Sequence, residues 1–254
     1  MKGLDAGAAT IPFRWFDELD STNAETRRLA EAGELGPVWI AARRQSAGRG
    51  RRGNIWETGA GNLAATLLIR TDRPPGEAAQ LSFVTALAVG DLARAFAPPD
   101  LVAFKWPNDV LLAGAKLSGI LIESGRAPDG SLWLAIGVGV NLVSAPAPDI
   151  KASTLADHLK AGTAAPPIAE TALAVLSTSL AERIAQWTRS GFEPVRAEWL
   201  ASAAGMGARC TARLGQGTLH GVAEGLDIDG ALLLRLDDGA VRRITAGDVF
   251  FGEP

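Results

Sequence analysis

The chain has 254 residues, 47% hydrophobic and 21% charged, a composition ordinary for a globular protein with one large core or two unequal ones. Its formal net charge of −3 argues against a general nucleic-acid binder, and its apolar runs are far shorter than the ~20 residues of a membrane span. Two histidines and one cysteine, Cys210, exclude a disulfide framework and an imidazole metal site. No export signal is visible in the first twelve residues, so we expect a cytoplasmic protein.

Hydrophobic periodicity predicts an α+β domain with a mixed or antiparallel sheet and packed helices. Thr22 and Glu25 have the spacing of a capping box at the start of the first helix. Strands are expected at 13–16, 38–43, 63–70, 102–106, 110–112, 116–123 and 132–142. Helices are expected at 22–33, 77–97, 167–187 and 193–203.

The last part of the chain differs in character from the rest. Short strand patterns alternate with glycine turns, and about five strands in some fifty residues predict a small β-barrel. We therefore expect two domains, 1–204 and 205–254.

The stretch GRGRRG at 48–53 matches the dinucleotide-binding pattern G-x-G-x-x-G. A strand precedes it, and Asp72 lies at a suitable distance for the acidic residue of that motif. The required helix is missing, because the residues from Asn54 onward have no helical period and include two more glycines. The sequence therefore predicts another use for these glycines.

Five arginines and no acid lie between Arg43 and Arg52, in a connection of nearly twenty residues without regular structure. Connections longer than about 12–15 residues are usually functional or disordered. Arginine grips phosphate or carboxylate oxygens through its planar fork, and Trp56 at the end of the segment could stack on a base. The residues alone are compatible with two interpretations. One is a loop that closes on an anion, and the other is a basic loop exposed to solvent.

Three further clusters have both a structural and a functional interpretation. Lys105, Asn108 and Asp109 belong to KWPND, which is either turn chemistry or a strand end presented to a pocket. Lys116 at a strand start anchors an anion only if it is shielded from water. The glycines of GVGVN at 137–141 indicate either tight strand packing or the close approach of a ligand.

Together and in this order, the motifs resemble those of biotin protein ligases (biotin–[acetyl-CoA-carboxylase] ligases). The resemblance covers about residues 13 to 250. Its motifs are DSTN at 20–23, Q-x-A-G-R-G-R-x-G at 45–53 with Trp56, KWPND at 105–109, K-x-x-G-I-L at 116–121 and G-x-G-x-N at 137–141.

The resemblance implies a catalytic domain like that of class II aminoacyl-tRNA synthetases, followed by an SH3-like β-barrel. It implies that the carboxylate of biotin attacks the α-phosphorus of ATP, with Mg²⁺, to give biotinyl-5′-AMP and pyrophosphate. A lysine of the biotin carboxyl carrier protein of acetyl-CoA carboxylase then attacks this mixed anhydride and releases AMP. Two anions must meet, so cations have to neutralise both, and a loop must exclude water from the anhydride.

Carried onto this chain, the resemblance implies Lys116, Arg51 and Asp109 as catalytic residues, with Lys116 bridging carboxylate and α-phosphate. No residue is implied as a metal ligand, although Asp109 could help position a metal or the incoming lysine. The implied binding residues are Ser21, Thr22, Asn23 and Gln45 at the biotin ring, Gly48, Arg49, Gly50, Arg51 and Lys116 at the junction, and Trp56, Asn108 and Asn141 at the nucleotide.

Some relatives carry an N-terminal DNA-binding domain. Here about a dozen residues precede the first strand, so we expect a monofunctional ligase that binds neither DNA nor membrane. A free sheet edge could pair two copies as a homodimer or receive the carrier domain. The alternatives are a lipoate or octanoate ligase and a non-catalytic nucleotide- or RNA-binding module.

Overall fold

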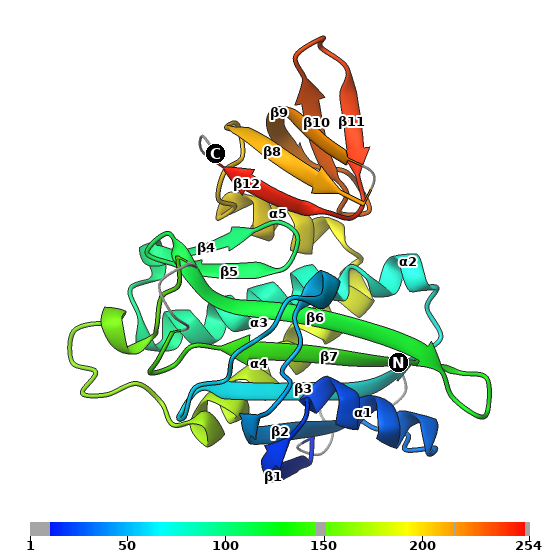
Figure 1. Ribbon diagram of the computed structural model, residues 1–254, viewed down its shortest axis with the longest axis vertical. Coiled ribbons are helices and arrows are strands. Elements are labelled where there is room, and N and C mark those ends of the chain that lie inside the picture. Colours follow the sequence, from blue (N-terminus) through cyan, green and yellow to red (C-terminus); the bar gives the residue numbers. More distant parts are fainter. Residues whose placement is uncertain (1–10, 146–150, 216, 252–254) are drawn as a thin grey trace.

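Seven strands form one mixed sheet that is the base of the molecule (Figure 1). The computed structural model describes residues 11–145, 151–215 and 217–251, so the first ten residues, where no export signal is expected, lie outside it. The strand order is β1-β2-β3-β7-β6-β5-β4, with β1 parallel to β2 and the other pairs antiparallel. The strands are β1 (Phe13–Leu19), β2 (Val38–Gln45), β3 (Leu63–Thr71), β4 (Val102–Lys105), β5 (Asp109–Leu112), β6 (Ala115–Arg126) and β7 (Leu132–Val140).

The period of two along each strand gives the sheet two different faces. In β7, Leu134, Ile136 and Val138 point into the main hydrophobic core. The alternate positions of β7, including Gly137 and Gly139, face the other side, where Trp133 belongs to a smaller core. The second face therefore carries small residues next to a cavity, which a fully packed sheet would not need.

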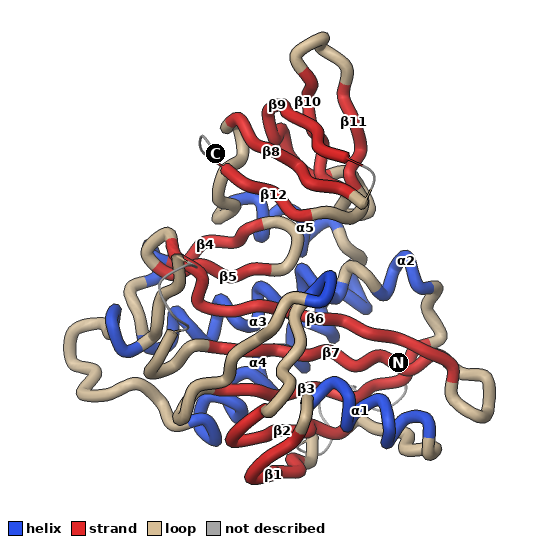
Figure 2. The backbone as a smooth tube through the Cα atoms, viewed as in Figure 1, coloured by secondary structure: helices blue, strands red, loops and turns tan. Residues whose placement is uncertain are grey.

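Helices cover both faces. The core face packs against α3 (Leu81–Phe96) and α4 (Ala169–Ser190), and the opposite face carries α1 (Thr22–Glu31). The remaining helices are α2 (Pro75–Ala78) and α5 (Glu193–Ala201). Figure 2 shows the segment between β2 and β3 crossing the sheet on the side of α1. That segment and α1 therefore enclose the small-residue face.

The C-terminal module is a five-stranded antiparallel sheet of order β11-β10-β9-β8-β12. Its strands are β8 (Arg209–Leu214), β9 (Gly217–Leu226), β10 (Leu232–Leu236), β11 (Val241–Ile244) and β12 (Asp248–Phe251). The expected small SH3-like module is confirmed, although its sheet does not close into a barrel, because no ladder joins β11 to β12 within residues 205–215 and 217–251. Only residues 245–247 carry the chain from one sheet edge to the other, so the sheet curls strongly, consistent with an SH3-like fold.

The module packs against the β4 edge of the large sheet. The Trp106 indole Nε1 donates to Gly230 O at 3.1 Å, and Lys105 Nζ lies 5.6 Å from the centroid of the Phe250 ring. The main hydrophobic core is continuous from the large sheet into the module, with Trp199 buried between them. This contact holds the module beside the turn that joins β4 to β5.

The expected strands and the α4 and α5 helices are confirmed within a few residues at their ends. The helix expected at 77–97 is divided into α2 and α3. The capping box is wrong: Ser21 is the N-cap residue without a side-chain cap, and Glu25 pairs with Arg28 instead. Within the described ranges, no helix has the length and apolarity needed to cross a bilayer.

Candidate active site

A cavity of about 1650 Å³ lies between α1, the sheet, the segment joining β2 to β3, and the C-terminal module. This volume exceeds that of a typical single-ligand pocket of about 300–1,000 Å³. All of the predicted site residues line it except Gly48. They are Ser21, Thr22, Asn23, Gln45, Arg49, Gly50, Arg51, Trp56, Asn108, Asp109, Lys116 and Asn141.

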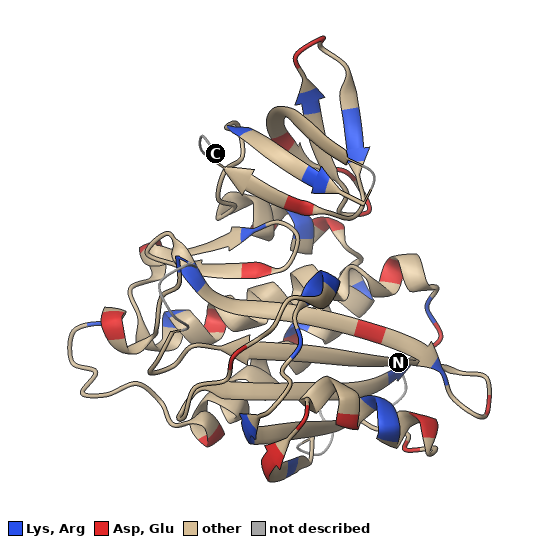
Figure 3. Ribbon diagram, viewed as in Figure 1, with Lys and Arg blue, Asp and Glu red and all other residues tan. Residues whose placement is uncertain are grey.

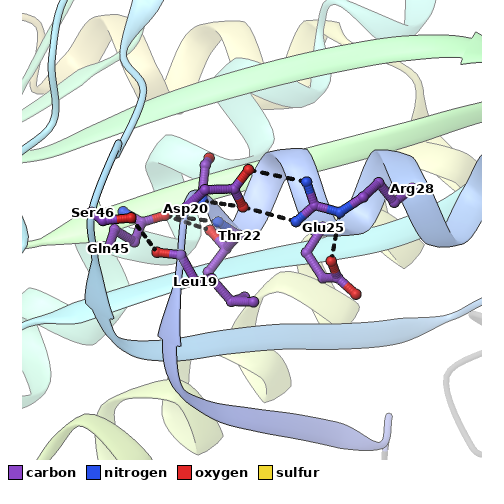
Figure 4. Close-up of polar contacts among 8 residues, drawn as sticks. Leu19, Asp20, Thr22, Glu25, Arg28, Gln45 and Ser46 are labelled. Atoms are coloured by element: carbon purple, nitrogen blue, oxygen red, sulfur yellow. Dashed lines mark hydrogen bonds and ion pairs between the residues drawn. The ribbon is translucent and has the colours of Figure 1, made fainter.

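One end of the cavity is neutral and polar, built where β1 ends and α1 begins (Figure 4). Thr22 N donates to Gln45 Oε1 at 2.8 Å, and Gln45 Nε2 donates to Thr58 Oγ1 at 3.0 Å. The amide of Gln45 is thereby fixed in orientation between α1 and the loop. Ser21, Thr22 and Asn23 are all buried, so this end offers few, well-positioned hydrogen-bonding groups.

Asp20 anchors the same segment from outside the cavity. The Arg28 guanidinium donates to both of its carboxylate oxygens, at 2.8 and 3.0 Å, and lowers the pKa of Asp20 to about 2. A depressed carboxyl pKa stabilises the fold above the unfolded value of 3.8, and this contribution is lost as pH falls through 2. The Asp20 side chain is 45% exposed, so solvent screens the pair.

We therefore expect Asp20→Asn to lower the free energy of unfolding by about 0.5 kcal/mol at neutral pH, with the difference vanishing as pH falls from 4 towards 2. Urea unfolding of the wild type and of Asp20→Asn between pH 2 and pH 7 measures this difference in the free energy of unfolding. The matched control is Asp17→Asn, whose side chain is fully exposed. A constant difference at every pH would show that charge is not the cause.

Two residues that the sequence did not reveal extend the polar end beneath α1. The Thr66 hydroxyl donates to Asn23 Oδ1 at 2.7 Å and lies 2.8 Å from Thr22 Oγ1. Asn23 Nδ2 donates to Glu123 Oε2 at 2.8 Å. The Thr22 hydroxyl donates its single proton to Gln45 Oε1 at 3.2 Å, so its oxygen keeps a lone pair for the cavity.

Glycines form the floor of the cavity. Register places Gly139 between Ala64 of β3 and Gly119 of β6. A Cβ on Gly139 would lie 2.2 Å from Trp56 Cε2, and a Cβ on Gly137 would lie 2.0 Å from Asn23 Oδ1. The motif G-x-G therefore lets the side chains of Asn23 and Trp56 lie directly on the sheet, which is tight packing of protein side chains; the close approach of a ligand stays a prediction.

The arginine loop, residues 46–62, has more structure than the sequence indicated. Gly50 N donates to Asn54 O at 2.7 Å and Trp56 N to Gly48 O at 3.0 Å, so the loop doubles back on itself. A Cβ on Gly48 would lie 2.1 Å from Trp56 O, which explains this glycine as a turn residue. The motif itself ends in a three-residue 3₁₀ turn, Arg51–Gly53, and the next regular element is a strand, β3, so the helix that a dinucleotide site requires is missing.

Lys116 lies at the centre of the cavity. Its Nζ is 2.7 Å from Asp109 Oδ1 and 5.7 Å from the centroid of the Trp56 ring. The Lys116 side chain is 30% exposed and that of Asp109 is 19% exposed. Partial shielding strengthens the attraction of this cation for an anion over its value in open water.

Arg51 extends from the loop to the turn between β4 and β5. Its Nη1 donates to Asn108 Oδ1 at 3.2 Å and to Gly247 O at 3.4 Å. Burial lowers the pKa of the Arg51 guanidinium, and Asp248 and Asp109 oppose that shift. Because arginine ordinarily titrates far above neutral pH, Arg51 stays charged and adds a second cation near Lys116.

Asn141 supports the backbone of the strand that carries Lys116. It is 1% exposed, and its Nδ2 donates to Lys116 O and to Ser153 O, both at 3.3 Å. These bonds fix the backbone that carries Lys116. Its Oδ1 is buried with no protein hydrogen-bond partner in the described residues, so it can accept a bond from a ligand.

The C-terminal module supplies lining residues that no sequence motif indicated. Phe250 lies between Lys105 and Arg213, whose charged groups are 5.6 and 4.5 Å from its ring centroid. Asp248 also lines the cavity. Figure 3 shows basic residues along the loop that crosses the sheet and again in β8. One end of the cavity is thus cationic and the other neutral.

No three His, Cys, Asp or Glu side chains converge as a metal site anywhere in residues 11–145, 151–215 and 217–251. Cys210 is buried, and burial raises the pKa of its thiol, which fits a structural role.

Comparisons with known proteins identify the family. Residues 16–141 match the Biotin/lipoate A/B protein ligase family, and residues 205–252 match the Biotin protein ligase C terminal domain. The second match separates the chain from lipoate ligases, which the first family model also includes.

The chain is 44% identical to a biotin–[acetyl-CoA-carboxylase] ligase of Paracoccus denitrificans over 92% of this chain and 98% of that one. It is 30% identical to the bifunctional ligase/repressor BirA of Bacillus subtilis, covering 94% of this chain and 73% of that one. A biotin protein ligase from Aquifex aeolicus, solved with biotin and ATP, shares the fold with a TM-score of 0.78 at 24% identity, covering 96% and 99% of the two chains. The chain is therefore an enzyme that belongs to the biotin protein ligase family.

Proposed function

We propose that this enzyme attaches biotin to one lysine of the biotin carboxyl carrier protein of acetyl-CoA carboxylase, through a biotinyl-5′-AMP intermediate. The observation that carries the proposal is a single cavity with a neutral polar end and a cationic end, with Lys116 between them. A ligand with an uncharged polar ring and a carboxylate fits this division. The Paracoccus ligase, whose name states the same acceptor enzyme, supports the choice of acceptor.

The neutral end suits the ring of biotin. The Thr22 hydroxyl has a lone pair for a ring N–H, and Gln45 Nε2 has a second proton for a carbonyl oxygen. Ser21 and Asn23 complete this end. The carboxylate of biotin would then point towards Lys116 and Arg49.

The cationic end suits the phosphates of ATP. In the first step a biotin carboxylate oxygen bonds to the α-phosphorus, and the bond from that phosphorus to the oxygen of the leaving pyrophosphate breaks. Lys116 and Arg51 stabilise the charge shared by carboxylate and phosphate, as preorganised cations do. Trp56 covers the base, and Asn108 and Asn141 hold the nucleotide.

In the second step the acceptor lysine nitrogen bonds to the acyl carbon, the bond from that carbon to the phosphate oxygen breaks, and AMP leaves. The attacking amine must lose a proton. Asp109 is a half-buried carboxylate 2.7 Å from the Lys116 ammonium group, and we assign it to position the incoming amine or a metal.

Mg²⁺ is compatible with this donor set only as an ion held mainly by the nucleotide. Mg²⁺ commonly binds substrate phosphates with one or two carboxylates, and Asp109 would supply one. When bound, the ion neutralises phosphate charge. The described residues contain no cluster of three His, Cys, Asp or Glu side chains that could hold the ion without the nucleotide.

The same proposal includes a cytoplasmic location, ligase activity without DNA binding, and a division into domains 1–204 and 205–254. Coverage of 98% of the Paracoccus ligase supports the monofunctional activity. Pairing of a free sheet edge with a second copy or with the carrier domain stays a prediction.

The test is ATP–pyrophosphate exchange with Mg²⁺ and biotin, lipoate, octanoate or no acid, followed by transfer to the carrier domain. We expect exchange with biotin alone, and transfer that is abolished when the carrier's acceptor lysine is replaced by arginine. Exchange with lipoate or octanoate instead would contradict the choice of substrate, and no exchange with any acid would contradict adenylation.

A further inference from the structure

The C-terminal module holds the tip of the arginine loop. Arg52 Nη1 donates to Asp248 Oδ2 at 3.0 Å and to Arg213 O at 3.0 Å. Asp248 and Arg213 are register partners in β12 and β8, so both acceptors lie at one place on the module. The neighbouring Arg51 also donates to the module, at Gly247 O. Two consecutive arginines therefore join the loop to a segment about 200 residues later in the chain.

The backbone at this tip needs such support. Arg52 has φ 55° and ψ 30°, the left-handed region that a residue with a Cβ rarely adopts. Sparsely populated conformations persist when surrounding contacts hold them. Backbone bonds across the turn, Gly50 N to Asn54 O and Asn54 N to Arg51 O, hold it from within, and the side chain of Arg52 adds the contacts with the module, so the placement of the loop tip against the module depends on Arg52.

Arg51 gains its position from this arrangement. It follows Gly50 and precedes Arg52 in the 3₁₀ turn, and its guanidinium reaches Asn108 on the far side of the cavity. Without the bonds of Arg52 to the module, only the long bonds of Arg51 to Asn108 Oδ1 and Gly247 O would hold the turn across the cavity. Movement of the turn would then open the cavity beside Arg51.

We propose that Asp248 is a positioning residue that, through Arg52, keeps the arginine loop closed over the acyl-adenylate until an acceptor lysine arrives. The inference rests on the proposed function. Asp248 touches no reacting atom: it sets how long the loop stays closed. The module thus has a part in retaining the intermediate, separate from any part in forming it.

The exposure of the pair sets the size of the effect. The side chains of Arg52 and Asp248 are 38% and 35% exposed, and exposed ion pairs bias an equilibrium only modestly. Loss of the pair should therefore raise the rate of intermediate loss by about two- to five-fold. The chemical step, which depends on Lys116, should change less.

The experiment incubates the enzyme with biotin, ATP and Mg²⁺ without acceptor and measures AMP formation. Escaped acyl-adenylate is hydrolysed: a water oxygen bonds to the acyl carbon and the bond to phosphate breaks, giving biotin and AMP. We expect Asp248→Asn and Arg52→Gln each to raise AMP formation about two- to five-fold, with pyrophosphate exchange within about two-fold of wild type.

Two further variants make the test specific. Asp237→Asn removes a matched pair of the module, Asp237 with Arg209 at 2.9 Å, away from the loop, and should leave AMP formation unchanged. The charge-swapped double variant Arg52→Asp/Asp248→Arg should restore retention, because aspartate tolerates the left-handed conformation. Damage to folding alone would not be repaired by the swap.

The outcomes separate the two proposals. Wild-type exchange with biotin, but equal AMP formation in Asp248→Asn and Asp237→Asn, would overturn the role of Asp248 and leave the proposed function standing. The absence of biotin-dependent exchange in the wild type would instead overturn the proposed function.

Discussion

Lys116→Gln is expected to lower the rate of biotin-dependent ATP–pyrophosphate exchange by about 10²–10³-fold, the usual effect of losing one group that stabilises developing charge. The substitution removes the cation at the centre of the cavity. It also leaves the Asp109 carboxylate without the ammonium group 2.7 Å away, so a half-buried, unpaired negative charge would face the incoming phosphates. Both effects act against adenylation.

A second substitution separates the two effects. In Lys116→Gln/Asp109→Asn the uncompensated carboxylate is gone, so part of the lost exchange rate should return if repulsion contributes. The matched control is Lys160→Gln, an exposed lysine outside the cavity lining, with a wild-type rate expected. Exchange at the wild-type rate in Lys116→Gln would remove Lys116 from the mechanism.

The sequence was a good guide wherever function depends on neighbours along the chain. The apolar run at 132–142 predicted the strand that carries Gly137 and Gly139, and the break at KWPND predicted the turn that separates β4 from β5. Short-range patterns of this kind report strand direction and turn position directly. The family motifs then brought these clusters to one cavity.

The contacts that sequence could not supply are those between distant elements. Thr66 lies in an apolar run that reads only as a buried strand, and its hydrogen bond to Asn23 follows from how α1 packs on the sheet. The bond between Arg52 and Asp248 requires the packing of the C-terminal module on the β4 edge. No local periodicity encodes either packing.

Two local differences from the expectation, the open sheet of the C-terminal module and the absent capping box, have the same origin. The barrel was inferred from the number and spacing of short strands, but closure depends on whether the edge strands β11 and β12 pair. The capping box was inferred from the spacing of Thr22 and Glu25, but Arg28 binds the Glu25 carboxylate and Gln45 binds Thr22. In both cases a tertiary contact outweighs a local pattern.

A second large effect is expected when a side chain is added to Gly139 in the floor of the cavity. Gly139→Ala would place a Cβ 2.2 Å from Trp56 Cε2, closer than any real contact, so the Trp56 ring must leave the sheet. Overpacking of this kind costs about 1–3 kcal/mol, and here a loop side chain rather than the core gives way. We therefore expect the KM for ATP to rise about ten-fold or more, with little change in the unfolding midpoint.

Gly137→Ala provides the contrast, because its Cβ would lie 2.0 Å from Asn23 Oδ1 at the neutral end of the cavity. This variant should raise the KM for biotin more than the KM for ATP. Gly76→Ala, which meets no atom within 4 Å, is the matched control and should match the wild type in both constants. Steady-state exchange kinetics at varied biotin and varied ATP measure all three variants. If both cavity variants raised both constants equally, the division of the cavity into a biotin end and a nucleotide end would be wrong.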